Sequence, residues 1–180
     1  KKKFFLFLHY TETHKNLVRA IIEKYKQEDN DDDYFTNVKE NNQRFNSYIP
    51  ACNNYITTII QTLKEEGIYE KTIIVFFSDH GTSIGEKKGE KFYGVYLYDY
   101  TLKVFSVIKM PNITKKRLNQ QCSTIDLFPT ILELLGIKYS KEIQGKSLMG
   151  IINNSEKYER EIFAETGGLY GPWPSPKEHN

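Results

Sequence analysis

A carboxylate and an imidazole stand side by side at positions 79 and 80, directly after an apolar run. Thr72–Phe77 is typical of a buried strand, and Ser78-Asp79-His80-Gly81 follows it at once. Burying an ionisable group is costly unless a hydrogen bond or an ion compensates it. A carboxylate combined with imidazoles can form a site for a divalent cation. The pair therefore either caps a turn or binds a metal ion, and the spacing alone leaves both interpretations open.

A second polar cluster follows another apolar run. Phe4–Leu8 precedes the polar stretch from His9 to His14. In an open α/β sheet, functional groups gather beyond the carboxyl ends of the strands. If the two strands are neighbours, either histidine can face the pair at positions 79 and 80. The sequence therefore predicts one site at a common edge of the sheet.

A rival interpretation concerns the acidic stretch near residue 30. Acidic side chains occupy the first, third, fifth and twelfth places of an EF-hand calcium loop: Asp29, Asp31, Asp33 and Glu40. The sixth place, however, needs glycine for its sharp turn and holds Tyr34. A solvated acidic loop is therefore favoured. A non-catalytic calcium-binding or interaction module is retained as an alternative function.

Two common nucleophile signatures are absent from the sequence. It contains neither a GxSxG elbow nor a GxxxxGK[ST] phosphate loop. Cys52 and Cys122 have no base near them in the sequence and form no CxxC pair, so both are expected in the core. The 25 basic and 23 acidic residues give a net charge of +2, which argues against nucleic acid as a partner.

The elements that must position these groups follow from apolar periodicity. Four runs predict strands: Phe4–Leu8, Thr72–Phe77, Val104–Lys109 and Ile162–Glu165. Three stretches predict helices: Leu17–Tyr25, a helix whose apolar face runs from Phe45 to Leu63, and a helix from Ser123 to Gly136. Strands that alternate with helices predict an α/β fold with a largely parallel sheet.

Local signals set the limits of the two longer helices. Pro50 is compatible with a regular helix that begins just before it, and Gly67 is a natural stop. Ser123 and Asp126 form a capping-box pattern, and Gly136 ends the helix that they begin.

Several segments occur in a characteristic order between Phe4 and Leu148: "FFLFLHYTETH", "IIQTLKEEGIYEKTIIVFFSDHGTSIGE", "GVYLYDYTLKVFSVIKMP", "STIDLFPTILELLGI" and "IQGKSL". "SDHG" alone is a weak signal, but the ordered set resembles the sulfatases of the alkaline-phosphatase-like superfamily. It is similar to the C-terminal part of their catalytic domain. "FAETGG" near the end of the chain is similar to a further strand of that fold.

The resemblance implies roles for three residues. Asp79 and His80 match positions at which sulfatases bind a divalent cation, and His14 matches a histidine that contacts the ester and protonates the leaving oxygen. An oxygen-rich site favours calcium, while magnesium, manganese and zinc stay open. The family's nucleophile is a formylglycine made from Cys or Ser in a CxPSR-type motif, which is expected upstream of this chain.

The sequence also departs from the family pattern. It contains no CxPSR motif, and the early paired aspartates that complete the metal site are missing. This chain alone is therefore predicted to be inactive. Many relatives have a Lys or His that contacts the sulfate just before a glycine, whereas Tyr93 precedes the matching Gly94 here. The candidates to supply the charge instead are Lys87, Lys88 and Lys91.

The resulting prediction is an α/β, alkaline-phosphatase-like fold with a mostly parallel central sheet flanked by helices, incomplete in this chain. Residues 1–150 would be the C-terminal part of a sulfatase-type catalytic domain, and 151–180 a terminal strand and Gly/Pro-rich arm. The function would be hydrolysis of a small-molecule or glycan sulfate ester. A phosphate or phosphonate ester hydrolase, or a phospho-headgroup transferase, is the alternative on the same fold.

The compartment and the oligomeric state stay open at this level. The sequence shows no signal peptide and no membrane-spanning run, which slightly favours the cytoplasm.

Overall fold

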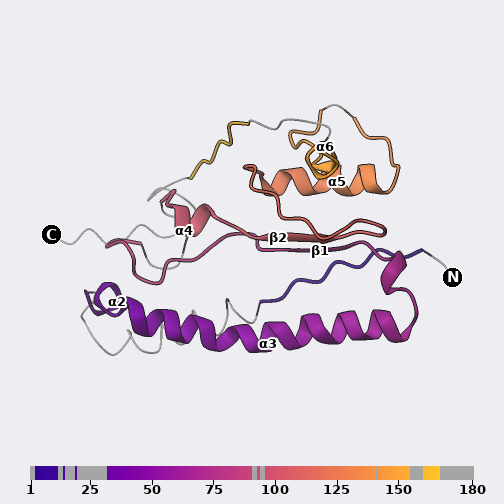
Figure 1. Cartoon of the computed structure of the whole chain (residues 1–180). Coiled ribbons are helices and arrows are strands. Elements are labelled where there is room, and N and C mark those ends of the chain that lie inside the picture. Colours follow the sequence, from indigo (N-terminus) through magenta and orange to yellow (C-terminus); the bar gives the residue numbers. More distant parts are fainter. Residues whose placement is uncertain are drawn as a thin grey trace. The chain divides into compact units, whose positions relative to one another are not determined.

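The computed structural model describes residues 3–11, 14, 19, 32–90, 93, 96–140, 142–154 and 160–166. Figure 1 traces the chain from indigo at the N-terminus to yellow at the C-terminus. The chain forms two compact units. Unit 1 comprises Lys1–Lys71 and Thr82–Tyr96, and unit 2 comprises Thr72–Gly81 and Leu97–Asn180.

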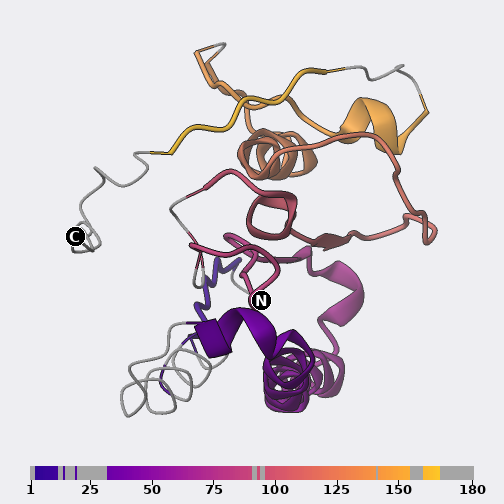
Figure 2. The same ribbon diagram turned by 90° about the vertical axis from the view of Figure 1, so that its left-hand side faces the viewer.

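Unit 1 is built on one long helix. α2 (Asp32–Thr36) leads into α3 (Val38–Glu65), and a short 3₁₀ turn, η1 (Tyr69–Lys71), follows. Figure 2 looks nearly along the axis of α3. Tyr34 is wholly buried and packs against Phe35, Phe45 and Tyr48, so part of the predicted apolar face of α3 does form a core.

The long helix begins earlier than the sequence predicts. Pro50 lies inside α3 rather than near its start. Proline lacks a backbone N–H, so the carbonyl of Asn46 loses its helical donor there. The residues before Pro50 nevertheless continue the helix because α2 packs against them through Tyr34. Tertiary packing therefore overrides the local signal.

Both predicted helix stops are confirmed. Gly67 has φ of 65°, its N–H donates to Lys64 O at 2.9 Å, and Ile68 N–H donates to Leu63 O at 3.0 Å. Gly136 has φ of 66° and makes the equivalent bond to Glu133 O at 3.0 Å. This is the Schellman arrangement, which requires a left-handed residue that glycine supplies at the lowest cost.

Unit 2 contains a strand pair and short helices. β1 (Ile74–Phe77) pairs antiparallel with β2 (Ser106–Lys109), with Ile74 opposite Lys109. The helices are α4 (Asp99–Leu102), η2 (Thr124–Asp126), α5 (Leu127–Leu134) and α6 (Met149–Ile152). Two of the predicted strands are thus confirmed. The strand pair that the described residues form is antiparallel, so it does not display the parallel order expected of the central sheet.

Unit 2 contains a small apolar core and a buried carboxylate. Leu148 and Ile151 pack against Leu118, Cys122 and Ile152. Asp126 is wholly buried and accepts hydrogen bonds from Ser123 N at 2.8 Å and Lys146 N at 2.8 Å, and it pairs with Arg160. The predicted capping box of Ser123 and Asp126 is confirmed, and the same carboxylate also fastens two later segments.

Two predicted strands are wrong for the described residues. Phe4–Leu8 and Ile162–Glu165 have no strand assignment, and most of their side chains are exposed, Phe5 at 83% and Phe163 at 88%. A strand needs a neighbour to satisfy its backbone groups and cover its side chains. Within the described residues no segment pairs with either run.

Two further predicted segments lie wholly or mostly outside the described residues. The helix predicted at Leu17–Tyr25 lies outside them except for Arg19, which is helical, and the arm from residue 167 onward lies outside them as well. Among the described residues, no helix combines the length and apolar character needed to cross a bilayer.

The calcium-loop interpretation is wrong. Asp29 and Asp31 lie outside the described residues, but α2 and α3 occupy most of the remaining places. A regular helix there is incompatible with an EF-hand loop, which must turn sharply around the ion. Glu40, the twelfth place, instead pairs with Arg44 at 3.0 Å.

Candidate functional site

The turn Ser78–Gly81 follows β1 and is fixed at both ends by backbone hydrogen bonds. Ser78 N–H donates to Phe105 O at 3.2 Å, which extends the strand pair by one bond. Gly81 N–H donates to Thr101 O at 2.8 Å, which ties the end of the turn to α4. The two side chains between these anchors therefore project from a constrained backbone.

Within this turn, the carboxylate and the imidazole face each other. Asp79 Oδ1 accepts the backbone N–H of His80 at 2.9 Å, and Asp79 Oδ2 lies 3.7 Å from His80 Nε2. His80 Nδ1 lies 2.6 Å from the carbonyl oxygen of Gly81. A carbonyl only accepts, so Nδ1 carries a proton, and Nε2 is the ring nitrogen that faces the carboxylate.

The turn-cap and metal interpretations are therefore compatible. One oxygen of Asp79 caps the turn, and the side chain is still 71% exposed. The second oxygen and Nε2 of His80 are the two donors that a divalent cation would use. A backbone carbonyl that fixes the tautomer of a ligating histidine is a common feature of metal sites. In the described part of the chain no group of three or more His, Cys, Asp or Glu side chains is arranged to hold a metal ion.

Gly81 is required by a close approach within unit 2. A Cβ atom at this position would overlap the carbonyl oxygen of Tyr100 and lie 3.2 Å from that of Lys103. Both obstacles are backbone atoms, so the turn itself would have to shift. The glycine thus lets the turn carrying Asp79 and His80 pack against α4.

We expect Gly81→Ala to lower the metal content of the full-length protein and to cost about 1–3 kcal/mol of stability, the usual range for overpacking. Elemental analysis and urea unfolding measure the two effects. Gly67→Ala is the control, because it meets nothing within 4 Å and strains only the end of α3. A Gly81→Ala protein with full metal content would contradict the prediction.

The remaining predicted site residues lie in unit 1. His14 has helical backbone and is exposed, and its ring lies 5.6 Å from that of Tyr93 between centroids. Lys87 and Lys88 are exposed on the loop 82–90, whereas Lys91 lies outside the described residues. The structure thus places the side chain of Asp79 beside that of His80, and the ring of His14 beside that of Tyr93. The convergence of His14 with Asp79 stays a prediction, since the two belong to different units.

The loop before Tyr93 is more ordered than its composition indicates. Ser83 is wholly buried, and its Oγ donates to Glu90 O at 3.0 Å and accepts from Gly85 N at 3.2 Å. Glu90 is also wholly buried and accepts Tyr96 N–H at 3.1 Å. These residues carry no signal in the sequence, because no periodicity marks a polar side chain that is buried by a loop.

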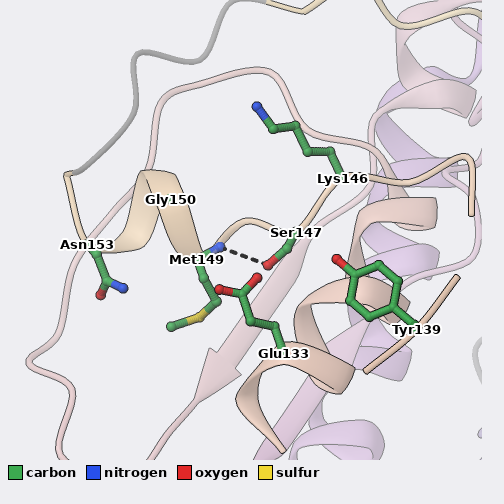
Figure 3. Close-up of a pocket in the computed structure, with 7 residues that line it drawn as sticks. All are labelled: Glu133, Tyr139, Lys146, Ser147, Met149, Gly150 and Asn153. Atoms are coloured by element: carbon green, nitrogen blue, oxygen red, sulfur yellow. Dashed lines mark hydrogen bonds between the residues drawn. The ribbon is translucent and has the colours of Figure 1, made fainter. Parts of the chain in front are cut away.

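A polar hollow of about 320 Å³ lies in unit 2 (Figure 3). It is lined by Glu133, Tyr139, Lys146, Ser147, Met149, Gly150 and Asn153. Met149 N–H donates to Ser147 Oγ at 3.2 Å, and Figure 3 shows the carboxylate of Glu133 and the phenol of Tyr139 turned toward Ser147. The lining contains none of the sequence-predicted site residues.

The two cysteines are half-buried and unpaired by disulfides. Burial raises the pKa of the Cys122 thiol, and the charge of Asp126 raises it further, against an opposing effect of Arg160. A raised thiol pKa keeps the sulfur protonated and a poor nucleophile. The expectation that Cys122 has a packing role is therefore supported.

Comparison with known proteins gives a consistent family assignment. A family model described as Sulfatase matches residues 1–137. An ulvan-active sulfatase of Formosa agariphila is 29% identical over 122 residues, which cover 67% of this chain and 20% of the relative. Arylsulfatase K of Gallus gallus is 32% identical over 118 residues, which cover 65% of this chain and 20% of the relative. The chain thus spans about a fifth of the length of the curated relatives that it matches.

Solved structures share the fold. A phosphonate monoester hydrolase from Silicibacter pomeroyi has a TM-score of 0.62 at 23% identity, covering 69% of this chain and 24% of that one. A protein solved in complex with its substrate D-glucosamine-2-N,6-O-disulfate has a TM-score of 0.55 at 24% identity, covering 75% of this chain and 28% of that one. The predicted alkaline-phosphatase-like α/β fold class, incomplete in this chain, is therefore confirmed.

Proposed function

Because the chain belongs to the sulfatase family, we propose that the full-length protein hydrolyses a sulfuric ester and that Asp79 and His80 bind its divalent cation. The observation that carries the proposal is the turn after β1, where Asp79 Oδ2 and His80 Nε2 lie 3.7 Å apart on a backbone anchored at both ends. This chain lacks a CxPSR motif, so it contributes part of the site and is inactive alone.

The roles of the residues follow from their chemistry. When bound, a divalent cation stabilises the negative charge that develops on the ester oxygens. Asp79 supplies a carboxylate oxygen and His80 a neutral imidazole nitrogen, while the backbone carbonyl of Gly81 holds the imidazole tautomer. An oxygen-rich donor set in the full-length protein would favour calcium, and the imidazole also admits manganese or zinc. The exposed lysines at positions 87 and 88, with Lys91, supply positive charge to the sulfate.

The direct test is catalytic. The full-length protein is expected to hydrolyse aryl and saccharide sulfates in a reaction that chelation of the metal abolishes and that added calcium restores. The proposal is refuted if the protein, loaded in turn with calcium, magnesium, manganese and zinc, hydrolyses no sulfate ester.

His14 is the proposed general acid that protonates the leaving oxygen. We expect His14→Ala to leave the metal content intact and to slow hydrolysis of esters with poor leaving groups by about 10²-fold or more, the usual contribution of a general acid. Activated aryl sulfates, whose leaving group needs no proton, are expected to react nearly as fast as with the wild type. The measurement is kcat across a series of leaving groups.

His9→Ala is the matched control for this prediction, because His9 is an exposed histidine five residues earlier in the same segment. We expect it to leave kcat unchanged for every ester. An equal slowdown of His14→Ala for activated and unactivated esters would argue against proton donation. If His9→Ala, and not His14→Ala, lost activity, His9 would be the general acid.

A second candidate function has one observation in its favour. The phosphonate monoester hydrolase from Silicibacter pomeroyi shares the fold, at an identity that shows the fold alone. The family model and the named relatives favour sulfate over phosphonate or a phospho-headgroup. The ratio of kcat/KM for matched aryl sulfate and aryl phosphonate esters separates the two, with the sulfate expected to react faster.

Sulfated saccharides are the proposed substrate class. One relative is named as active on ulvan, and one solved relative holds a disulfated glucosamine as its substrate. The cytoplasmic location expected from the sequence gains no support, because another relative, 27% identical and from Drosophila melanogaster, is named an extracellular sulfatase homolog.

A further inference from the structure

We propose that Asn41, on α3, is a positioning residue that locks the lysine loop, defined here as residues 82–90, and thereby sets the affinity for the sulfate group. The inference rests on the proposed function, because the loop presents Lys87 and Lys88. Asn41 touches no substrate in this proposal. It acts through the backbone of the loop.

The carboxamide of Asn41 connects two segments that are distant in the sequence. Its side chain is 1% exposed, and its Nδ2 donates to Tyr34 O at 2.9 Å and to Ile84 O at 2.9 Å. One donor group thus joins α2, α3 and the lysine loop. No other residue type of this size offers two N–H donors on a single neutral atom.

Tyr34 adds a second bond to the same loop. Its ring is wholly buried beneath Phe35, Phe45 and Tyr48, and its hydroxyl donates to Ser83 O at 2.7 Å. The carbonyl oxygens of Ser83 and Ile84 therefore both accept hydrogen bonds from side chains of α2 and α3. Ser83 Oγ then closes the loop on itself by donating to Glu90 O at 3.0 Å.

Gly85 makes the close approach possible. It has φ of 105°, and a Cβ at this position would lie 2.5 Å from Tyr34 O and 3.4 Å from Asn41 Nδ2. The left-handed region and the lack of room both select glycine. The loop backbone is thus pressed directly against the carboxamide that binds it.

The hydrogen bonds that hold the lysine loop are opposed by the cost of two buried acceptors. In the described part of the chain, Asn41 Oδ1 and Glu90 Oε2 are buried acceptors without a hydrogen-bond donor. Each such atom opposes the closed loop, because it loses its water on closure and gains no partner. The donors of Asn41 and Tyr34 must outweigh this cost, so their removal is expected to open the loop.

The consequence concerns the lysines. Lys87 and Lys88 are exposed at the tip of a loop whose two ends are fixed by Ser83 and Glu90. A fixed loop presents their ammonium groups at a defined place, and a released loop must be ordered again each time that an anion binds. Weaker binding with unchanged chemistry is the expected signature.

Asn41→Asp tests the lock in the full-length protein, since it replaces the donor by an oxygen of the same size. We expect tryptic cleavage after Lys87 and Lys88, followed by mass spectrometry, to accelerate about tenfold or more. KM for an aryl sulfate is expected to rise about tenfold with kcat within about twofold, since two lost buried bonds correspond to at least that factor. Metal content is expected to stay unchanged.

Asn46→Asp is the matched control, because Asn46 lies on the same helix with an exposed amide. We expect it to alter neither proteolysis nor KM. Tyr34→Phe removes the hydroxyl that donates to Ser83 O without placing a charge in the core, so it covers the case in which a buried aspartate prevents folding. We expect it to accelerate cleavage by a smaller factor, with circular dichroism like the wild type.

The outcomes separate the inference from the function on which it rests. Unchanged tryptic cleavage in both Asn41→Asp and Tyr34→Phe would overturn the lock. Faster cleavage with unchanged KM would overturn the positioning role while leaving the sulfatase proposal intact. If the wild-type protein hydrolysed no sulfate ester, the proposed function would fail, and faster cleavage in the variants would still establish the lock.

Discussion

Asp79→Ala is expected to strip the full-length protein of its divalent cation while leaving the fold nearly as stable as before. The carboxylate is 71% exposed, and its Oδ1 accepts a hydrogen bond only one residue away along the chain, from His80 N. Removing such a group changes stability by about 1 kcal/mol or less. Loss of an anionic ligand, by contrast, leaves the site with a neutral imidazole that binds hard cations weakly.

The effect on activity should be large. A bound cation supplies several kcal/mol of charge stabilisation in ester hydrolysis, so its loss is expected to lower kcat by about three orders of magnitude. Elemental analysis of dialysed protein measures the metal, and thermal unfolding confirms the fold. These two readouts distinguish a ligand from a residue that merely stabilises the turn.

Asp99→Ala is the control for charge. Asp99 is in the same unit, its side chain is 79% exposed, and it pairs with Lys103 at 2.6 Å. We expect its replacement to leave metal content and activity unchanged. If the Asp79→Ala protein kept its full metal content, the assignment of Asp79 as a metal ligand would be wrong.

Asp126→Asn is expected to produce the largest loss of stability. The buried carboxylate serves three donors, namely the N–H groups of Ser123 and Lys146 and the guanidinium of Arg160. The amide of asparagine has the same shape as the carboxylate, but its NH₂ group would face one of these donors. It also carries no charge, so the guanidinium of Arg160 would lose its counter-ion. Breaking a buried ion pair costs about 3–5 kcal/mol, and the partly exposed Arg160 puts the expectation near the lower end.

The midpoint of urea unfolding measures this loss, with Asp99→Asn as the control. That variant makes the same chemical change at an exposed pair and is expected to stay within about 0.5 kcal/mol. Charge removal alone would affect both variants equally. Equal stability of the two proteins would contradict the view that Asp126 fastens the segments around α5.

The features predicted correctly from the sequence are those whose partners lie close along the chain. The stops at Gly67 and Gly136 bond groups within five residues, and the capping box joins Ser123 to Asp126 three residues on. The turn with Asp79 and His80 is equally local. Residue type is enough in these cases, because the donor and the acceptor are fixed by one or two backbone dihedral angles.

Features that depend on distant partners were missed or misjudged. The bond of Asn41 to Ile84 spans 43 residues, and the pair of Asp126 with Arg160 spans 34. Phe4–Leu8 has the composition of a buried strand, yet composition does not provide the neighbour that a strand requires. Pro50 marks a helix start by propensity, but packing by Tyr34 extends α3 past it.

The sequence by itself thus determined the family, the fold class and the place of Asp79 and His80 in a turn directly after a strand, since ordered motifs and local bonds carry that information. Only the tertiary structure decided which glycines admit a close backbone and that the lysine loop is held by a helix. Those facts follow from atoms meeting across long stretches of chain, and no local pattern encodes such a meeting.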